Sequence, residues 1–381
     1  MPPGSPPTTS CAPRSTSAYC GRPSRACRLR EETSNGSERL HPAYLERTYL
    51  ASHPELTDAA RELVHNDISA NPQKYAQSEH AQALLSYAGV HHHLLDELHR
   101  IEDMGSDEEF EQTRNRLFDD MRDELLKIVR IDALAVDAQL LAIILADTPV
   151  DACLGDLMKL ETSAADYLQQ SVPGFDMEAP HYWANNVLAD GVTAADLTVS
   201  EPALIGWLHT LEAISQLCMA SARYRAAANY ARRVLKAEGY PTRAAGTVLL
   251  ALARLEDQDG FFALAHQLEE QMGADALENS PWYLLARTIL LFKTNKMRPA
   301  TRALREFANR CEGGAFFLLN PMYQTPYLPC RPEPRDPWDL SHQAVWEADG
   351  IISDTPDFAP WANACEDVSQ LAQEFARRYG F

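Results

Sequence analysis

The chain has 381 residues, a mass of 42.5 kDa and a formal net charge of −20, with 45% hydrophobic and 23% charged residues. That composition is ordinary for a folded, water-soluble protein, and the length is enough to bury a sizeable core. Because so acidic a body repels phosphate backbones, we expect no nucleic-acid ligand and favour neutral or basic partners.

Cysteine usage and hydropathy indicate the compartment. Eight Cys are too few for a disulfide scaffold, and none forms a Cys-x-x-Cys pair, which favours a reducing environment. The longest apolar runs, Leu140–Ala146 and Val248–Ala253, are far shorter than the ~18 residues that span a bilayer. Residues 1–40 lack the apolar centre of a secretory signal. We therefore expect a cytoplasmic protein without a membrane span.

The first 40 residues are rich in Pro, Ser, Thr and Arg and show no hydrophobic period. Such a segment cannot bury enough apolar surface to offset the entropy of ordering. We predict a disordered, basic and dispensable tail.

Residues 54–171 form an N-terminal helical region that resembles further repeats. Ser106 is a good N-cap for the third of its helices because acidic residues follow in the first turn. The predicted helices are Leu56–His65, Gln77–Glu102, Asp107–Val129, Ala133–Ala146 and Val150–Gln170. A turn-rich connection follows from Val172, and another helix is expected over Trp183–Ala189.

Residues 200–311 show one two-helix pattern three times. In the first unit Leu208, Leu211, Ile214 and Cys218 form an apolar stripe at helical spacing, and a second stripe from Ala227 ends at Gly239-Tyr240-Pro241. The second unit pairs Ala245–Leu255 with Phe261–Glu270, and the third pairs Trp282–Phe292 with Pro299–Arg310. Small residues recur in the second helices at Ala227, Ala263 and Ala300. Such a period is typical of stacked hairpins, since no single hairpin can bury its own stripe.

These units resemble the tetratricopeptide repeat. Leu211 stands where the family has Trp, Ile214-Ser215 where it has Leu-Gly, Cys218 where it has Tyr and Gly239 where it has Pro. The resemblance implies an α-solenoid of TPR-like hairpins.

A wider stretch, Asp67 to Ala362, is similar to bacterial relatives of the suppression-of-tumorigenicity-seven family. The similarity lies in Leu125–Asp132, in Ser280–Phe292 and in Asn320–Leu328. It implies a tetratricopeptide-like solenoid with a non-repetitive C-terminal cap, and brings no chemistry with it.

Residues 312–381 form that cap. Repeated Pro from Pro321 to Pro337 prevents regular helix over much of the segment, while its aromatic residues predict packing against the last hairpin. Two closing helices are expected, Leu340–Ile352 and Pro360–Arg378.

One constellation could bind a metal. On a helix, His92, Asp96, His99 and Asp103 fall within about 60° of arc, and imidazole with carboxylate suits a divalent cation. The alternative is a set of solvated polar residues beside the stripe of Leu84, Leu95 and Leu98, which is the commoner arrangement. His91 is expected to be a hydrogen-bonded core histidine.

No phosphate-binding, dinucleotide-binding, nucleophile-elbow or zinc-protease string occurs, so we do not expect an enzyme or a cofactor. The predicted function is an adaptor that holds a protein or peptide on a concave face lined by the first helices. Its predicted lining is His209, Glu212, Gln216, Thr247, Arg254, Tyr283 and Arg287. A metal-dependent enzyme or metal-binding protein centred on His91–Asp103, and a homo-oligomer joined through the repeat ends, are the alternatives.

Overall fold

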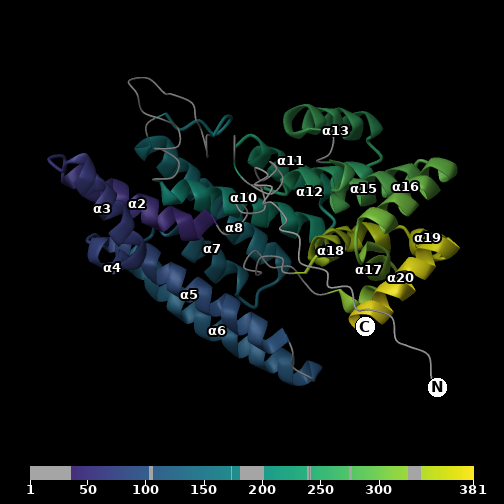
Figure 1. Ribbon diagram of the computed structural model, residues 1–381, viewed down its shortest axis with the longest axis horizontal. Helices are drawn as coiled ribbons and strands as arrows, with labels where there is room; N and C mark the ends of the chain where they lie inside the picture. Colours follow the sequence, from purple (N-terminus) through teal and green to yellow (C-terminus); the bar gives the residue numbers. More distant parts are fainter. Residues whose placement is uncertain are drawn as a thin grey trace, which may run out of the picture. The chain divides into compact units, whose positions relative to one another are not determined.

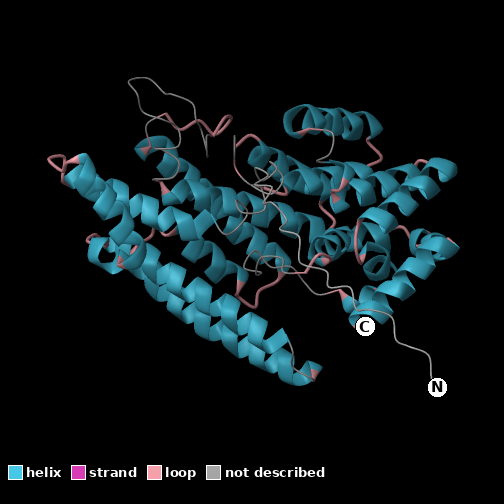
Figure 2. Cartoon of the chain, viewed as in Figure 1, coloured by secondary structure: helices cyan, strands magenta, loops and turns pink. Residues whose placement is uncertain are grey.

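Helices dominate the computed structural model, which describes residues 36–381 apart from 103–105, 173, 181–200, 238–239, 241, 274–276 and 325–335. Residues 35–381 form one compact unit. Every regular element in the described residues is a helix, which confirms the all-α prediction (Figure 2). None of these helices has the length and apolar character needed to cross a membrane. The predicted helix Trp183–Ala189 lies outside the described residues, as do residues 1–35 of the predicted tail.

The helices of the N-terminal region are α2 (Gly36–Ser52), α3 (Asp58–Ala70), α4 (Pro72–Tyr75), α5 (Glu79–Glu102), α6 (Asp107–Ile131), α7 (Val136–Ile144) and α8 (Val150–Ser171). Five of them, α3 and α5 to α8, lie close to the predicted ranges, whereas α2 and α4 were not predicted. Ser106 caps α6 as predicted, because its hydroxyl accepts a hydrogen bond from the Glu109 amide at 3.5 Å. Helices α5 and α6 pack along each other as a long hairpin (Figure 1).

Helix α2 corrects the predicted end of the tail. Residues 36–40, expected to be disordered, are helical, and the helix runs on through Pro42. Pro in a helix interior argues against helix in any pattern-based prediction. Tertiary packing outweighs it here: Leu45 is almost fully buried with Ile68 of α3 and Tyr75 of α4.

The repeat region contains six principal helices. They are α10 (Pro202–Ala220), α11 (Tyr224–Leu235), α12 (Ala244–Arg254), α13 (Gln258–Met272), α15 (Pro281–Lys293) and α16 (Met297–Arg310). Helix α10 packs on α11, α11 on α12, α12 on α15 and α15 on α16.

The first helix of each pair ends in the same turn. Ala222, Glu256 and Asn295 adopt left-handed backbone conformations with φ of 59°, 60° and 57°. After each of them the next amide bonds back to the carbonyl five residues earlier, as in the bonds Arg223 to Cys218, Asp257 to Leu252 and Lys296 to Leu291. This is the Schellman helix ending, formed here without glycine. The three pairs therefore share a turn geometry that the sequence pattern did not reveal.

Helix α13 departs from the expected equivalence. Ala227 and Ala300 are fully buried, but Ala263 is exposed, and α13 buries Phe261, Ala265 and Leu268 instead. Helix α13 also packs less extensively on α12 than the other second helices do on their partners. The predicted spacing of small residues thus holds for α11 and α16 but not for α13.

The C-terminal region is more helical than predicted. It contains α17 (Gly314–Leu319), a 3-10 turn at Pro321–Tyr323, α18 (Asp339–Ser353), α19 (Phe358–Asn363) and α20 (Glu366–Tyr379). The expected single last helix is two helices, with a break at Ala364-Cys365. Buried residues on both, such as Phe358 and Phe375, join the same core as α10, α12 and α15.

Candidate functional site

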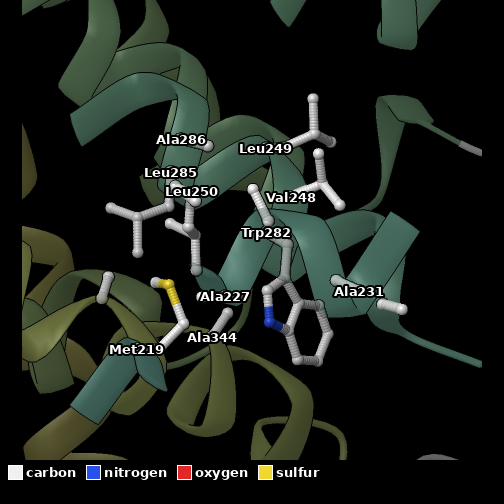
Figure 3. Packing of buried hydrophobic residues seen from close by; sticks show 14 of the residues in the cluster. Met219, Ala227, Ala231, Val248, Leu249, Leu250, Trp282, Leu285, Ala286 and Ala344 are labelled. Carbon is white, nitrogen blue, oxygen red and sulfur yellow. The ribbon is translucent and has the colours of Figure 1, made fainter. Parts of the chain in front are cut away.

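The face formed by the first helices is covered by α18. This helix packs against α10, α12 and α15, and it contributes the fully buried residues Ala344, Val345, Ala348 and Ile351. Figure 3 shows Ala344 of α18 among residues of the repeat helices, including Trp282 and Leu250. The chain itself therefore occupies the position in which a partner was expected.

Two of the predicted lining residues bond to α18 or to the residue that follows it. Thr247 is only 5% exposed, and its hydroxyl lies 3.5 Å from the Glu347 carboxylate. Arg254 donates to Asp354, just after α18, at 3.2 Å, and Tyr224 donates to the same oxygen at 3.2 Å. Both positions were predicted to face a partner, and in the structure their neighbours are Glu347 of α18 and Asp354, the residue after it.

Glu347 is the most unusual residue of this contact. Its carboxylate, on a residue 9% exposed, accepts hydrogen bonds from the Trp282 indole at 2.8 Å and from the Gln343 amide at 3.3 Å. The Arg243 guanidinium lies over the Trp282 ring, 5.9 Å from its centre, and donates to Gln343 at 2.8 Å. Burial raises the pKa of Glu347 to about 7, and the Trp282 hydrogen bond and the Arg243 charge offset only part of that rise.

Gly246 allows Trp282 to approach α12. A Cβ atom at position 246 would lie 2.4 Å from Cγ of Trp282, which is closer than any real contact. The indole therefore reaches Glu347 only because residue 246 has no side chain.

A second tryptophan is arranged in the same way. Trp207 of α10 is fully buried, and its indole donates at 2.9 Å to Glu161 of α8, which is 8% exposed. Arg233 lies over the Trp207 ring at 5.7 Å and, unlike Arg243, pairs directly with its glutamate at 2.6 Å. Neither glutamate, Glu161 or Glu347, was among the residues predicted from the sequence pattern.

His209 and Glu212 form hydrogen bonds with parts of the chain other than α18. His209 bonds to Asp137 of α7 at 2.8 Å. Burial alone would lower the pKa of His209. The charge and the hydrogen bond of Asp137 outweigh burial and raise this pKa to about 9. Glu212 accepts hydrogen bonds from Tyr240, at 3.0 Å, and from Thr242. Burial raises the pKa of Glu212, and His209 and these two hydroxyls oppose the rise.

The remaining predicted residues point to different neighbours. Tyr283 stacks on Phe261 of α13, and Arg287 pairs with Glu306 of α16. Gln216 is half-buried on α10. The structure therefore brings Thr247 and Arg254 together under α18 but does not gather the whole predicted lining on one face.

The helix proposed for a metal shows a simpler arrangement. His92 and Asp96 form an exposed pair at 3.3 Å. The side chain of His99 and all of Asp103 lie outside the described residues. Within the described part of the chain, no three His, Cys, Asp or Glu side chains are grouped so as to hold a metal ion. His91 is stacked on Tyr87, and burial lowers its pKa.

Comparison of the chain with known protein families, with curated proteins and with solved structures finds no match. The resemblance to tetratricopeptide repeats therefore stays a prediction.

Proposed function

We propose that the protein is an interaction scaffold in which the face of α10, α12 and α15 binds an acidic amphipathic helix of a partner protein. One observation carries the proposal: this face already holds such a helix. Helix α18 contains Asp339, Glu347 and Asp349 and no Lys or Arg, and it places small and branched apolar residues against the face. A helix lying in a groove is a common mode of peptide recognition.

The chemistry of the face suits carboxylates. Arg243 and Arg254 lie at the two ends of α12, and Trp282 and Thr247 add neutral donors between them. The Nε atom of Arg254 is buried and has no hydrogen-bond partner in the described residues. A second carboxylate oxygen would satisfy that donor, whereas Asp354 meets only the terminal nitrogen. The preference for neutral or basic partners that the net charge suggested would then not apply to this face.

The repeat architecture supports the same function. Three helix pairs with the same Schellman turn fit a TPR-like row of hairpins, an architecture that presents one face of its first helices to a ligand. In that arrangement α18 lies where a ligand of the row would lie.

A partner would enter at the end of α18 near Asp354. The side chains of Arg254 and Asp354 are 31% and 44% exposed, so their ion pair is partly solvated and contributes at most ~1 kcal/mol. By contrast, Ala344 and Ala348 in the middle of α18 are fully buried. Exchange would therefore begin at Asp354 and proceed toward Glu347.

The test is capture of partners from the native host with the full chain and with two charge reversals. Arg254→Glu removes the cation that faces Asp354. Arg225→Glu is the matched control, since Arg225 is exposed on α11 and forms no ion pair in the described residues. We expect a partner with an acidic helix to be retained by the wild type and by Arg225→Glu and lost by Arg254→Glu. The same partners on all three proteins would contradict the proposal.

A further inference from the structure

Helix α18 holds its apolar residues and one carboxylate on the same buried side. Ala344, Glu347, Ala348 and Ile351 occupy positions i, i+3, i+4 and i+7 of the helix, and all four are buried. A carboxylate within an apolar stripe loses its hydration when the helix packs, and that loss is unfavourable for the charged form.

The groups around Glu347 stabilise its charge only in part. Trp282, Gln343 and Thr247 are neutral donors, and the bond that Arg243 makes to α18 goes to the Gln343 carbonyl oxygen. Among the described residues, no guanidinium pairs directly with Glu347 as Arg233 pairs with Glu161.

Burial also raises the pKa of Asp349, on the same helix, and the other charged groups near α18 are paired elsewhere. On α12, Arg254 pairs with Asp354, and on α10, Glu212 bonds to Tyr240 and Thr242. His342 of α18 lies against Phe317, 4.4 Å between ring centres, and the six residues of α17 include no titratable side chain. Arg243 is therefore the charge that acts on Glu347 from the surrounding helices.

We propose that the packing of α18 on α10, α12 and α15 takes up one proton from solvent, and that the Glu347 carboxylate carries it. The protonated form keeps the indole hydrogen bond through an oxygen that still accepts, and it no longer buries a charge. When α18 leaves the face, the carboxyl group returns to water and releases the proton.

The direction of the pH effect follows from the two states of Glu347. Its pKa is about 7 when α18 is packed, against the ordinary value of 4.5 when it is free. Between these two pH values the packed state binds more protons than the free helix. The free energy that favours packing of α18 therefore falls as pH rises from about 4.5 to about 7, and it does not change further above pH 7. Opening of α18, and with it access to the proposed partner face, is therefore favoured on the alkaline side of this window.

Hydrogen exchange of the full chain, read by mass spectrometry, measures the opening of α18. After correction for the intrinsic exchange rate, we expect the opening equilibrium of residues 339–353 to rise up to ~10-fold per pH unit between pH 5 and 7 and to level off by pH 8. In Glu347→Gln, whose amide stays neutral and still accepts from Trp282, the same residues should show no such rise. Helix α6, which does not contact Glu347, serves as the internal reference.

A second measurement needs no variant. Carbon-detected NMR of the side-chain carboxyl groups should show Glu347 titrating near pH 7. Titration near pH 4.5, or an equal pH dependence of α18 in wild type and Glu347→Gln, would overturn the proposal. Neither readout involves a partner, so partner capture and proton uptake can fail separately.

Discussion

The two tryptophan clusters of this chain differ in the partner of their arginine. In both, an indole donates to a buried glutamate while an arginine lies over the ring. At Trp207 the arginine pairs with the glutamate, and at Trp282 it bonds to Gln343 instead. The first cluster joins α8 to α10 within a charge-balanced contact. The second joins the C-terminal α18 to α15, and in the part of the chain that the structure describes its carboxylate has no direct ionic partner.

This difference separates a permanent contact from one that can respond to conditions. A buried pair in which both charges are matched is costly to break, because either partner alone is a buried or half-buried charge. A buried carboxylate with neutral donors can instead be discharged by a proton. The same three residue types thus give α8 a fixed attachment and α18 a conditional one.

The largest expected effect comes from closing the space beside Trp282. Gly246→Ala places a methyl group against the indole and should lower the free energy of unfolding by about 3 kcal/mol, the upper end for overpacking. Chemical denaturation monitored by circular dichroism measures it. Gly155→Ala on α8 is the control, since no atom lies within 4 Å of its added Cβ, and there we expect a gain of about 0.5–1 kcal/mol. Equal effects of the two changes would mean that the close approach at Trp282 is wrong.

Breaking the matched pair should be the next largest change. Glu161→Gln keeps an acceptor for Trp207 but leaves Arg233 without its carboxylate. We expect the free energy of unfolding to fall by about 2 kcal/mol at pH 7.5. This is less than for a fully buried pair, because the side chain of Arg233 is 31% exposed. Denaturation of the variant in parallel with the wild type provides the value. A second variant, Glu161→Gln with Arg233→Met, should recover part of the loss, because it removes the unpaired charge.

The same isosteric change at the second cluster should have the opposite sign. The pKa of Glu347 is raised to about 7 in the folded protein, against 4.5 in the unfolded chain. Its ionisation therefore lowers the free energy of unfolding once the pH exceeds 4.5, and this loss reaches its full size above pH 7. A rise in pKa from 4.5 to about 7 corresponds to about 3 kcal/mol. The buried amide of glutamine is itself unfavourable to desolvate and offsets part of that gain. Glu347→Gln should therefore raise the free energy of unfolding by about 1 kcal/mol at pH 8 and lower it at pH 4.5. Unfolding curves at both pH values give the comparison. If Glu161→Gln and Glu347→Gln destabilise the protein alike at pH 8, the distinction between the two clusters is lost.

Sequence reasoning found the helices because their signals are local. Ser106 with its acidic first turn marks the start of α6, and the apolar stripes of α10 and α15 give their positions. It missed α2, in which the packing of Leu45 stabilises a helix despite Pro42. It also treated Ala263 as equivalent to the buried Ala227 and Ala300, because the repeat period alone does not give the rotation of α13 about its axis.

The site was less accessible to sequence reasoning because its contacts join residues far apart in the chain. Thr247 and Arg254 were predicted to face a partner, and nothing near them in the sequence indicates that α18, about 100 residues later, covers them. A local signal did exist for Glu347, since a carboxylate between Ala344, Ala348 and Ile351 interrupts an apolar stripe. That signal indicates a buried charge, but only the fold shows that Trp282 and Gln343 are its hydrogen-bond partners.

The smallest expected effect concerns the two arginines. Lysine lacks the planar guanidinium that stacks on an indole and presents fewer donors. Arg233→Lys should lower the free energy of unfolding by about 1 kcal/mol, because it weakens an ion pair and a ring contact together. Arg243→Lys loses a ring contact and a bond to a neutral amide, so we expect a decrease of about 0.5 kcal/mol. Thermal unfolding at pH 7.5 resolves the two variants by their difference in midpoint. A larger decrease in the free energy of unfolding for Arg243→Lys would show that the Arg243 guanidinium stabilises the Glu347 charge more than its bond to Gln343 implies. The contact of α18 would then resemble the charge-balanced contact of α8.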